Sequence, residues 1–411
     1  MKPSVLVTTT CRWFPTARLA VALANAGFTV AAAHPSSHPI CKTTAVSKTY
    51  PYRGLAPLAS FAAAISAMKP DLIVPADDYA ARHLHRLYDR ESRSGKGELG
   101  ALIERSLGSP ESFSFVNARS AFMQLAEQSG VRVAQTEVIA TARELRQWIS
   151  RVSLPTVLKA DGTSGGDGVR IVHTLEDAEQ ALRELQAPPL LARAAKRALV
   201  DHDQTLLWPS VLRRRSVVNA QAYISGSEAT STAACWKGKV LASLHFEVLK
   251  KADSAGHATV VRLIENADMS KAAEIMVRRL NLSGLLGFDF ILEADTGHAY
   301  LLEINPRATQ VGHLTLGPGR DLPAALYSAV SGESLQPAPI VTNRDTIALF
   351  PQEWIRDPGS EFLRSAYHDV PWEEPELVRA CVQAGRNQRT WYSEQNADQL
   401  LTSACQIPEH K

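Results

Sequence analysis

The sequence predicts a fold of the α/β class, in which a doubly wound N-terminal domain is followed by a region of alternating strands and turns. Three observations support this prediction: a β-α-β pattern at the start of the chain, a glycine-rich loop after Lys159, and an acidic strand pair around Thr296. A chain of 411 residues has room for roughly two to four domains of ordinary size.

The first part of the chain, residues 1–112, is predicted to form the doubly wound domain. Short β-branched runs predict its strands, and apolar residues at helical spacing predict its helices, with Gly27 and Pro70 as helix ends. The predicted elements are a strand over 4–8, a helix over 16–26, a strand over 28–33, a helix over 58–68 and a strand over 71–75.

Polar residues follow two of these strands. Thr9 and Thr10 come after the first strand, and Asp77 and Asp78 come after the last. Because ligands bind outside the carboxyl ends of parallel strands, these residues are candidates for a crevice that holds a small substrate. Helix capping and turn formation are the alternative for the two aspartates. The first strand-to-helix turn contains no glycine, which disfavours a dinucleotide-binding oxidoreductase.

Composition and charge exclude several classes of protein. The 44 Lys and Arg residues are balanced by 42 Asp and Glu residues, which disfavours a nucleic-acid binder that relies on phosphate neutralisation. The N-terminal apolar run is too short for a signal peptide, and no apolar stretch is long enough for a membrane span. The five cysteines are scattered without a C-x-x-C pair, as in reduced cytosolic proteins. We therefore expect a cytoplasmic protein without nucleic-acid or membrane partners.

A lysine-ended strand and a glycine-rich loop form the first motif with chemical content. The strand over 156–159 ends at Lys159, and a second strand over 169–172 follows the loop. Glycines let consecutive backbone N–H groups face an anion. Because a strand follows and no Gly-Lys-Ser/Thr ends the loop, it is not a P-loop; a mobile glycine-rich hairpin is the alternative. The loop glycines are Gly162, Gly165, Gly166 and Gly168.

The second motif is a predicted β-hairpin centred on Thr296. Two alternating apolar runs flank an Asp-Thr-Gly turn, which places Asp289 opposite Glu303. Period-two alternation puts Asn305 and Arg307 on the same face. Opposed carboxylates destabilise a sheet unless a cation neutralises them, and Mg²⁺ commonly bridges carboxylates to nucleotide phosphates. The sequence therefore predicts a magnesium site, with a solvated hairpin edge as the alternative.

In the order of these motifs the chain resembles the ATP-grasp enzymes, with a layout like that of the carbamoyl-phosphate synthetase, biotin carboxylase and D-alanine–D-alanine ligase group. The resemblance extends over residues 1–330, and the glycine loop and the Glu-Ile-Asn-Pro-Arg segment at 303–307 are its most specific parts. It implies that a two-lobed domain with antiparallel sheets follows the N-terminal domain and holds ATP between these sheets. The implied divisions are a pre-ATP-grasp α/β domain over 1–112, a lid or small subdomain over 113–225, a nucleotide- and metal-binding subdomain over 226–330, and a proline-rich acidic extension over 331–411.

The resemblance also implies roles for individual residues. Lys159 resembles the strand-end lysine on the α- and β-phosphates, and the loop glycines resemble the phosphate lid. Arg119, at the start of a helix predicted over 118–128, matches a further phosphate-binding cation. Arg307 resembles the arginine that stabilises the transferring phosphoryl group, so Lys159 and Arg307 are the implied catalytic residues. The implied adenine- and ribose-binding segment contains Gln221, Tyr223, Ile224 and Glu228, and the implied magnesium ligands are Asp289, Glu303 and Asn305.

The implied activity is the ATP-dependent ligation of a small carboxylic acid to an amine, through an acyl phosphate and with release of ADP and phosphate. The implied metal is Mg²⁺, with Mn²⁺ as a substitute. Two alternatives stay open: a non-catalytic nucleotide-sensing module, and a kinase-like phosphoryl transfer that yields a stable ester. The sequence identifies neither substrate, and it leaves the oligomeric state open while being compatible with a homodimer.

Overall fold

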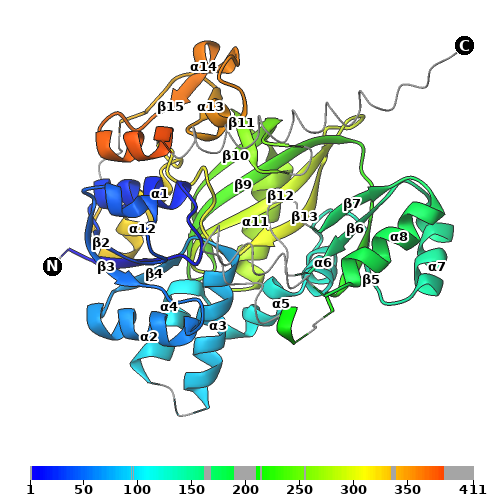
Figure 1. Ribbon diagram of the computed structural model, residues 1–411, viewed down its shortest axis with the longest axis horizontal. Coiled ribbons are helices and arrows are strands. Elements are labelled where there is room, and N and C mark those ends of the chain that lie inside the picture. Colours follow the sequence, from blue (N-terminus) through cyan, green and yellow to red (C-terminus); the bar gives the residue numbers. More distant parts are fainter. Residues whose placement is uncertain are drawn as a thin grey trace, which may run out of the picture.

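The computed structural model describes residues 2–93, 95, 97–161, 168–188, 210–212, 215–253, 256–334 and 339–383. Three sheets organise them: a parallel sheet of four strands, a smaller lobe with four antiparallel strands, and a large sheet of seven strands. The parallel sheet lies at the left of Figure 1, the large sheet in the centre and the small sheet at the right. The predicted α/β class with an N-terminal parallel domain and two antiparallel lobes is confirmed.

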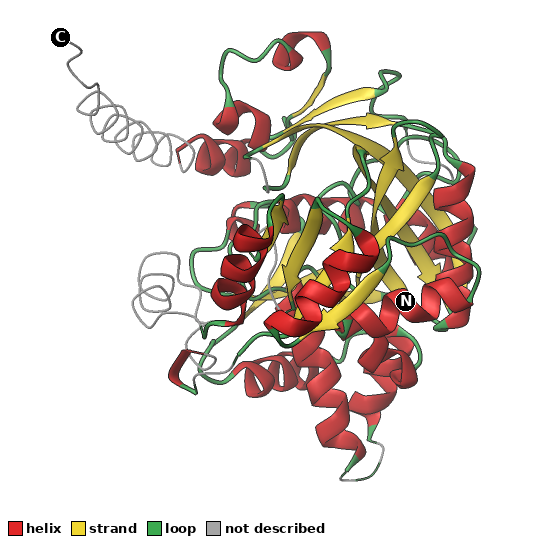
Figure 2. Cartoon of the chain, turned by 90° about the vertical axis from the view of Figure 1, so that its right-hand side faces the viewer, coloured by secondary structure: helices red, strands yellow, loops and turns green. Residues whose placement is uncertain are grey.

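The N-terminal parallel sheet is doubly wound and has the strand order β3-β2-β1-β4. Val5 and Val7 of β1 pack into one helix layer and Leu6 packs into the other, because successive side chains of a strand point to opposite faces. Figure 2 shows these strands lying between helices. Each of the five elements predicted here is confirmed, with ends shifted by at most one residue. The elements are β1 (Ser4–Thr8), α1 (Pro15–Asn25), β2 (Thr29–His34), η1 (Pro39–Lys42), β3 (Val46–Pro51), α2 (Pro57–Met68), β4 (Leu72–Pro75), α3 (Asp78–Ser92) and α4 (Glu98–Leu107).

The small sheet has the order β5-β8-β6-β7, and two amphipathic helices cover one of its faces. The indole of the buried Trp148 donates to Thr156 Oγ1 over 2.8 Å in this layer. A capping box between Thr141 and Glu144 fixes the start of α7. The opposite face carries Lys159, because the neighbouring Leu158 and Ala160 point into the helix layer. The elements are β5 (Thr136–Ile139), α7 (Ala142–Val152), β6 (Thr156–Ala160), β7 (Val169–Val172), α8 (Leu175–Gln186) and β8 (Val218–Ala222).

The large sheet has the order β13-β12-β9-β10-β11-β14-β15, and the chain enters it after β8, at residue 226. Helices α6 and α11 pack on β12 and β13 in a buried cluster around Phe288 and Met276. The helix predicted over 118–128 is confirmed as α6. The elements are η2 (Pro110–Ser112), α5 (Phe113–Asn117), α6 (Arg119–Gln128), β9 (Gly226–Trp236), β10 (Lys239–Lys251), β11 (Ala258–Leu263), α11 (Ala267–Arg279), β12 (Gly284–Glu293) and β13 (Ala299–Asn305).

Two strands of the large sheet come from residues after 331. β14 pairs with β11, and β15 pairs with β14, so part of the segment expected as an extension continues the sheet that follows residue 226. Helix α12 lies between the large sheet and α1 of the N-terminal domain, and Leu322 and Leu326 belong to the buried cluster that the two share. The elements are α12 (Leu322–Ser331), β14 (Thr346–Leu349), α13 (Gln352–Arg356), α14 (Phe362–Ser365) and β15 (Tyr367–Asp369). Among the described residues, no helix combines the length and apolar character that crossing a membrane requires.

A buried charge cluster fastens β15 to the N-terminal domain. Asp369 is 2% exposed and accepts a hydrogen bond from Arg18 of α1. Its other carboxylate oxygen lies 2.6 Å from His313 Nε2. Burial alone would raise the pKa of Asp369, but Arg18 and His313 outweigh it and hold the pKa below the ordinary carboxyl value. The ionised carboxylate therefore stabilises the contact between α1, β15 and the loop that contains His313.

The Asp369→Asn variant is expected to lower the free energy of unfolding by about 3 kcal/mol, because it leaves the buried Arg18 guanidinium with only the exposed carboxylate of Glu373, 3.7 Å away, as a charge partner. Denaturant unfolding at pH 7 measures this loss, and Glu376→Gln is the matched control, because Glu376 pairs with Arg379 in an exposed ion pair worth less than about 1 kcal/mol. Since the stability from a carboxylate with a lowered pKa is lost as the pH falls through that pKa, the deficit should shrink below about pH 4. Equal unfolding free energies for the two variants at pH 7 would contradict the role of the cluster.

Candidate active site

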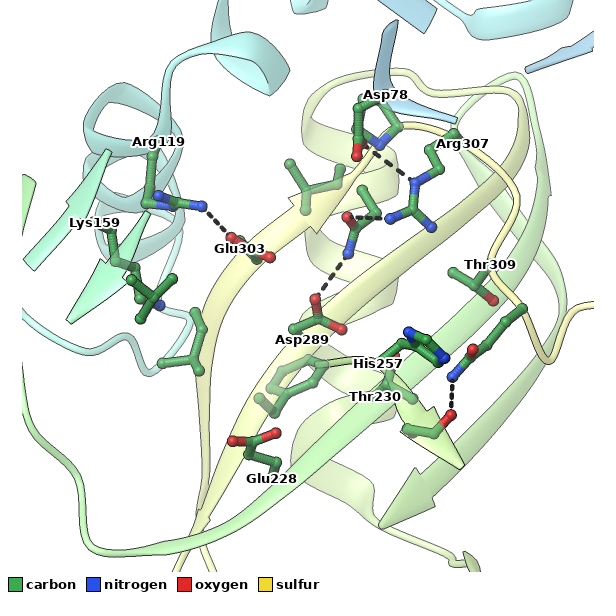
Figure 3. A pocket seen from close by; sticks show the side chains of 18 of the residues that line it. Asp78, Arg119, Lys159, Glu228, Thr230, His257, Asp289, Glu303, Arg307 and Thr309 are labelled. Carbon is green, nitrogen blue, oxygen red and sulfur yellow. Dashed lines mark hydrogen bonds and ion pairs between the residues drawn. The ribbon is translucent and has the colours of Figure 1, made fainter. Parts of the chain in front are cut away.

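A cavity of about 670 Å³ lies where the small sheet, the large sheet and α3 meet. Figure 3 shows Arg119 and Lys159 on one side of it and the β12–β13 hairpin on the other. Predicted site residues from five different elements and the loop after β13 meet at this cavity. Those that line it are Arg119, Lys159, Glu228, Asp289, Glu303, Asn305 and Arg307.

The carboxylates of Asp289 and Glu303 belong to directly opposed residues of β12 and β13, so the predicted pairing is confirmed. A bulge directly after Asp289 shifts the register towards the turn. Burial and the neighbouring Glu303 raise the pKa of Asp289 to about 7. Burial opposes ionisation of Glu303 as well, but Arg119 and Lys159 outweigh it and lower its pKa to about 2. At neutral pH the pair therefore holds one full negative charge on Glu303 and a partial one on Asp289.

Two cations face this pair, Lys159 from β6 of the small sheet and Arg119 from the start of α6. Arg119 donates to Glu303, and its Nη1 lies 3.8 Å from Asp161 Oδ1. Its buried Nε and Nη1 have no hydrogen-bond partner in the described structure. Lys159 is 8% exposed, and its side-chain ammonium group makes no hydrogen bond or ion pair with another described residue. Burial lowers its pKa to about 8, although Glu303 opposes the shift. Unsatisfied cationic donors in a cavity of this kind are suited to a phosphate.

Arg307 is held between the hairpin and the N-terminal domain. Its Nε lies 3.3 Å from Asp78 Oδ1, and its Nη2 donates to Asn305 Oδ1 over 3.1 Å. The guanidinium also lies over the Trp13 ring, 5.5 Å from its centroid. Asn305 in turn donates to Asp289 Oδ2 over 2.9 Å. Asp289, Asn305 and Arg307 thus form one hydrogen-bonded chain, as Figure 3 shows.

The two aspartates after β4 have separate roles. Asp77 caps α3 by accepting from the Ala80 backbone N–H over 2.8 Å, and it also binds Thr9 and Thr10 at the end of β1. Asp78, the next residue, points to the cavity and to Arg307. The structure therefore supports the helix-capping alternative for Asp77. It places Asp78 at a cavity, where the crevice interpretation expected it.

Only one residue of the predicted adenine- and ribose-binding segment lines the cavity. Glu228 lines the cavity and pairs with Lys251 over 2.7 Å. The Gln221 side chain is buried and donates to Thr136 Oγ1 over 3.0 Å. Gln221, Tyr223 and Ile224 are not among the residues that line the cavity, so a contact between this segment and adenine stays a prediction.

Of the predicted loop glycines, only Gly168 belongs to the described chain. Its φ of +82° lies in the left-handed region that favours glycine. Its carbonyl accepts from the Ala160 backbone N–H over 2.9 Å, which closes the loop between β6 and β7. Gly162, Gly165 and Gly166 lie outside the described residues.

Two cavity residues, Trp13 and Arg82, were not predicted from the sequence. Trp13 lies in the turn after β1, and its place beyond the carboxyl end of a central parallel strand is the signal that could have found it. Arg82 lies one helical turn after Asp78, so the two share a face of α3. A sequence pattern alone does not show which way this face points.

The donor set fits a nucleotide with a divalent ion. Two carboxylates and the Asn305 amide oxygen are hard ligands of the kind Mg²⁺ takes, and phosphate oxygens and water commonly complete its shell. In the described ranges, no cluster of three or more His, Cys, Asp or Glu side chains is placed to hold an ion, so an ion here depends on oxygen ligands from the nucleotide. The unpartnered nitrogens of Arg119 supply the matching anion site.

A cavity that both antiparallel sheets line, with two cations facing a pair of opposed carboxylates, is the arrangement that the resemblance to ATP-grasp enzymes implies. Residues 202–311 match the family described as "ATP-grasp domain". The chain therefore contains an ATP-grasp domain, which confirms the resemblance inferred from its motifs.

Individual proteins with related sequences and folds agree with this assignment. The carbamoyl phosphate synthase large chain of Synechocystis sp. is 23% identical over 232 residues, which cover 56% of this chain and 20% of that protein. The phosphoribosylamine–glycine ligase of Ralstonia nicotianae is 33% identical over 81 residues, 20% of this chain and 18% of that protein. The chain thus spans about a fifth of the length of these curated relatives.

A solved structure shares the fold over most of the chain. The biotin carboxylase domain of the 2-oxoglutarate carboxylase from Hydrogenobacter thermophilus, in complex with MgADP, ADP and bicarbonate, aligns with a TM-score of 0.56 and 13% identity. The alignment covers 81% of this chain and 70% of that one. At this identity the likeness concerns the fold.

Proposed function

We propose that the protein is an ATP- and Mg²⁺-dependent ligase that activates a small carboxylic acid as an acyl phosphate and joins it to an amine. The observation that carries the proposal is the position of Arg307, which is hydrogen bonded to Asn305 beside the carboxylate pair, in the cavity that Lys159 and Arg119 also line. Nucleotide binding alone does not need a guanidinium at that place. The names of the relatives, which include a phosphoribosylamine–glycine ligase, support the joining of a carboxylate to an amine.

Each side chain has a part in the proposed reaction. Lys159 and Arg119 bind the α- and β-phosphates, and Glu228 accepts from the ribose. Asp289, Glu303 and Asn305 hold Mg²⁺, which when bound neutralises negative charge on the phosphates. Arg307 stabilises the charge that develops on the γ-phosphoryl group during transfer.

The reaction consists of two group transfers. A carboxylate oxygen of the acid attacks the γ-phosphorus, the bond from that phosphorus to the β,γ-bridging oxygen breaks, and ADP leaves. The amine nitrogen then attacks the acyl carbon of the acyl phosphate. The amine loses a proton, the bond to the phosphate oxygen breaks, and inorganic phosphate leaves with the new amide as product. Positioning and electrostatics do most of the work in both steps.

The purified full chain tests this function when it is incubated with ATP, Mg²⁺ and a panel of small carboxylic acids, with and without hydroxylamine. We expect ADP to form only with a matching acid, and a hydroxamate to accumulate when hydroxylamine traps the acyl phosphate. A stable phosphate ester instead of a hydroxamate would favour kinase-like transfer. Nucleotide binding without ADP formation for every acid would favour a sensing module.

We also propose that the protein works in the cytoplasm, with small carboxylate and amine substrates as its partners. Cys41, Cys235 and Cys381 are free thiols, and the last two are buried. Unpaired thiols are typical of a reducing compartment.

The Asp78→Asn variant is expected to lower the turnover number by about tenfold or more while the KM for ATP changes little, because Asp78 orients Arg307 through a 3.3 Å contact and misplaced catalytic groups lose rate. Steady-state kinetics with the matching acid measures the effect. Asp89→Asn, at an exposed position of the same helix, is the control and should behave like the wild type. A higher KM for ATP with an unchanged turnover number would contradict the positioning role.

A further inference from the structure

Some of the cations that line the cavity are paired with a carboxylate, and others are not. Arg119 is paired with Glu303, Arg307 with Asp78, and Lys251 with Glu228. Three further lining cations, Lys159, Arg170 and Arg82, have no carboxylate partner in the described structure. Arg170 is exposed and donates to the Val169 carbonyl over 2.9 Å. The proposed function gives Lys159 to the nucleotide phosphates and leaves Arg82 without an assigned charge.

Arg82 is held at a fixed place on the wall of the cavity. It belongs to α3, a helix of 15 residues whose first turn is anchored by the Asp77 cap. The guanidinium carbon lies 5.7 Å from the centroid of the Tyr79 ring. Asp161 lies within the electrostatic range of Arg82, but its carboxylate already accepts from Asn219 over 2.9 Å and faces Arg119. Asp78, one turn earlier on α3, is paired with Arg307. Arg82 therefore offers its hydrogen-bond donors to a ligand in the cavity.

The distance from Arg82 to the reacting centre limits the ligand. Asp78 and Arg82 are four residues apart on one helix face, which places their Cβ atoms about 5–6 Å apart, and Asp78 contacts Arg307. An acid whose reacting carboxylate lies beside Arg307 can thus extend a second group along α3 to Arg82. A guanidinium binds carboxylate and phosphate groups in a bidentate manner, so the group at this end is an anion.

We propose that Arg82 binds a second anionic group on the acid that is activated, so that the substrate is a small acid with two anionic groups. This inference rests on the proposed ligase function. A dicarboxylic acid and an acid that carries a phosphate or phosphonate share the required chemistry.

The test compares acids in matched pairs on the full chain with ATP and Mg²⁺. The pairs are succinate with butyrate, glutarate with pentanoate, and glutamate with norvaline, and 3-phosphonopropionate represents the phosphorus-containing acids. For the wild type we expect kcat/KM for the acid with two anionic groups to be at least about tenfold higher within a pair. The dicarboxylate and phosphonate arms show which anion Arg82 prefers.

Substitutions connect this preference to Arg82. Arg82→Gln is expected to raise the KM for the preferred acid by about 10- to 100-fold, and Arg82→Lys should recover part of the loss, because it keeps the charge without the bidentate geometry. Arg86→Gln, one turn further along the same helix and exposed, should match the wild type. If Arg82→Gln raises the KM for ATP and leaves the preference between acids intact, Arg82 binds the nucleotide and the inference is wrong.

A binding measurement separates this inference from the proposed function. Thermal unfolding with Mg²⁺ and a non-hydrolysable ATP analogue should show that succinate or 3-phosphonopropionate stabilises the wild type and not Arg82→Gln. If this shift occurs and no acid yields ADP, the ligase function fails and the anion site remains. If ADP forms equally well with butyrate and succinate and no shift depends on Arg82, the ligase function stands and the second anionic group is excluded.

Discussion

The Glu303→Gln variant is expected to form ADP at least about 100-fold more slowly than the wild type at saturating ATP and acid. Glu303 connects the carboxylate pair to the cations of the site, because it lies opposite Asp289 on the hairpin and accepts from Arg119 at the start of α6. Glutamine keeps the size of the side chain and removes its charge. The metal then loses an anionic ligand, and Arg119 loses its charge partner beside the phosphates. Coupled measurement of ADP formation gives the rate.

The control for this variant is Asp295→Asn, which removes a carboxylate from the exposed turn of the same hairpin. It should leave the rate within about twofold of the wild type, because surface charges contribute little. Far-UV circular dichroism and thermal unfolding show whether Glu303→Gln is folded. Turnover by a folded Glu303→Gln at the wild-type rate would rule out the mechanism assigned to this site.

The hairpin is the part of the site that the sequence predicts best, and the reason is local. Its turn is short, and its side chains alternate with a period of two, so the turn centre at Thr296 determines the register. Asp289 and Glu303 follow from that register, and the structure pairs them. The bulge after Asp289 could not be predicted from the turn centre, because the extra residue leaves the apolar pattern of the strands almost unchanged.

The contributions of the N-terminal domain to the cavity could not be predicted in the same way. Trp13 and Arg82 face the hairpin only because the N-terminal domain packs beside it, and Ala308 N–H donates to the Pro75 carbonyl over 2.9 Å at that contact. Such a placement depends on contacts between residues more than 200 positions apart. Helical spacing places Arg82 on the face of Asp78 but does not identify what that face meets.

The segment after 331 shows a related limit. Its prolines favour irregular structure, and the strands β14 and β15 are 4 and 3 residues long. A strand of this length has too few residues to show alternation clearly. Its membership of the large sheet comes from pairing with β11, which is a contact at long range along the chain. The boundary at 330/331 therefore stays a prediction about domains, whereas the sheet continues across it.

The affinity for a Mg²⁺-bound, non-hydrolysable ATP analogue is expected to be highest between about pH 7 and pH 8 and to fall on both sides. Below about pH 7 the metal competes with a proton, because burial and Glu303 raise the pKa of Asp289 to about 7. Above about pH 8 Lys159 loses its charge, because burial lowers its pKa to about 8. Each arm has a slope of up to about tenfold per pH unit, as expected for one proton.

Calorimetric titrations from pH 5.5 to 9.5 measure the affinity on both arms. Two variants, and titrations without Mg²⁺, show which group is responsible for each arm. Lys159→Arg should remove the alkaline arm, because arginine stays charged throughout this range. Asp289→Asn should bind the metal–nucleotide complex more weakly and lose the acidic arm contributed by its carboxyl group. Omission of Mg²⁺ should weaken the acidic arm in the wild type and leave the alkaline arm in place, since Lys159 contacts phosphate and not the metal. An alkaline arm that persists in Lys159→Arg would show that another group titrates there and would remove Lys159 from the phosphate site.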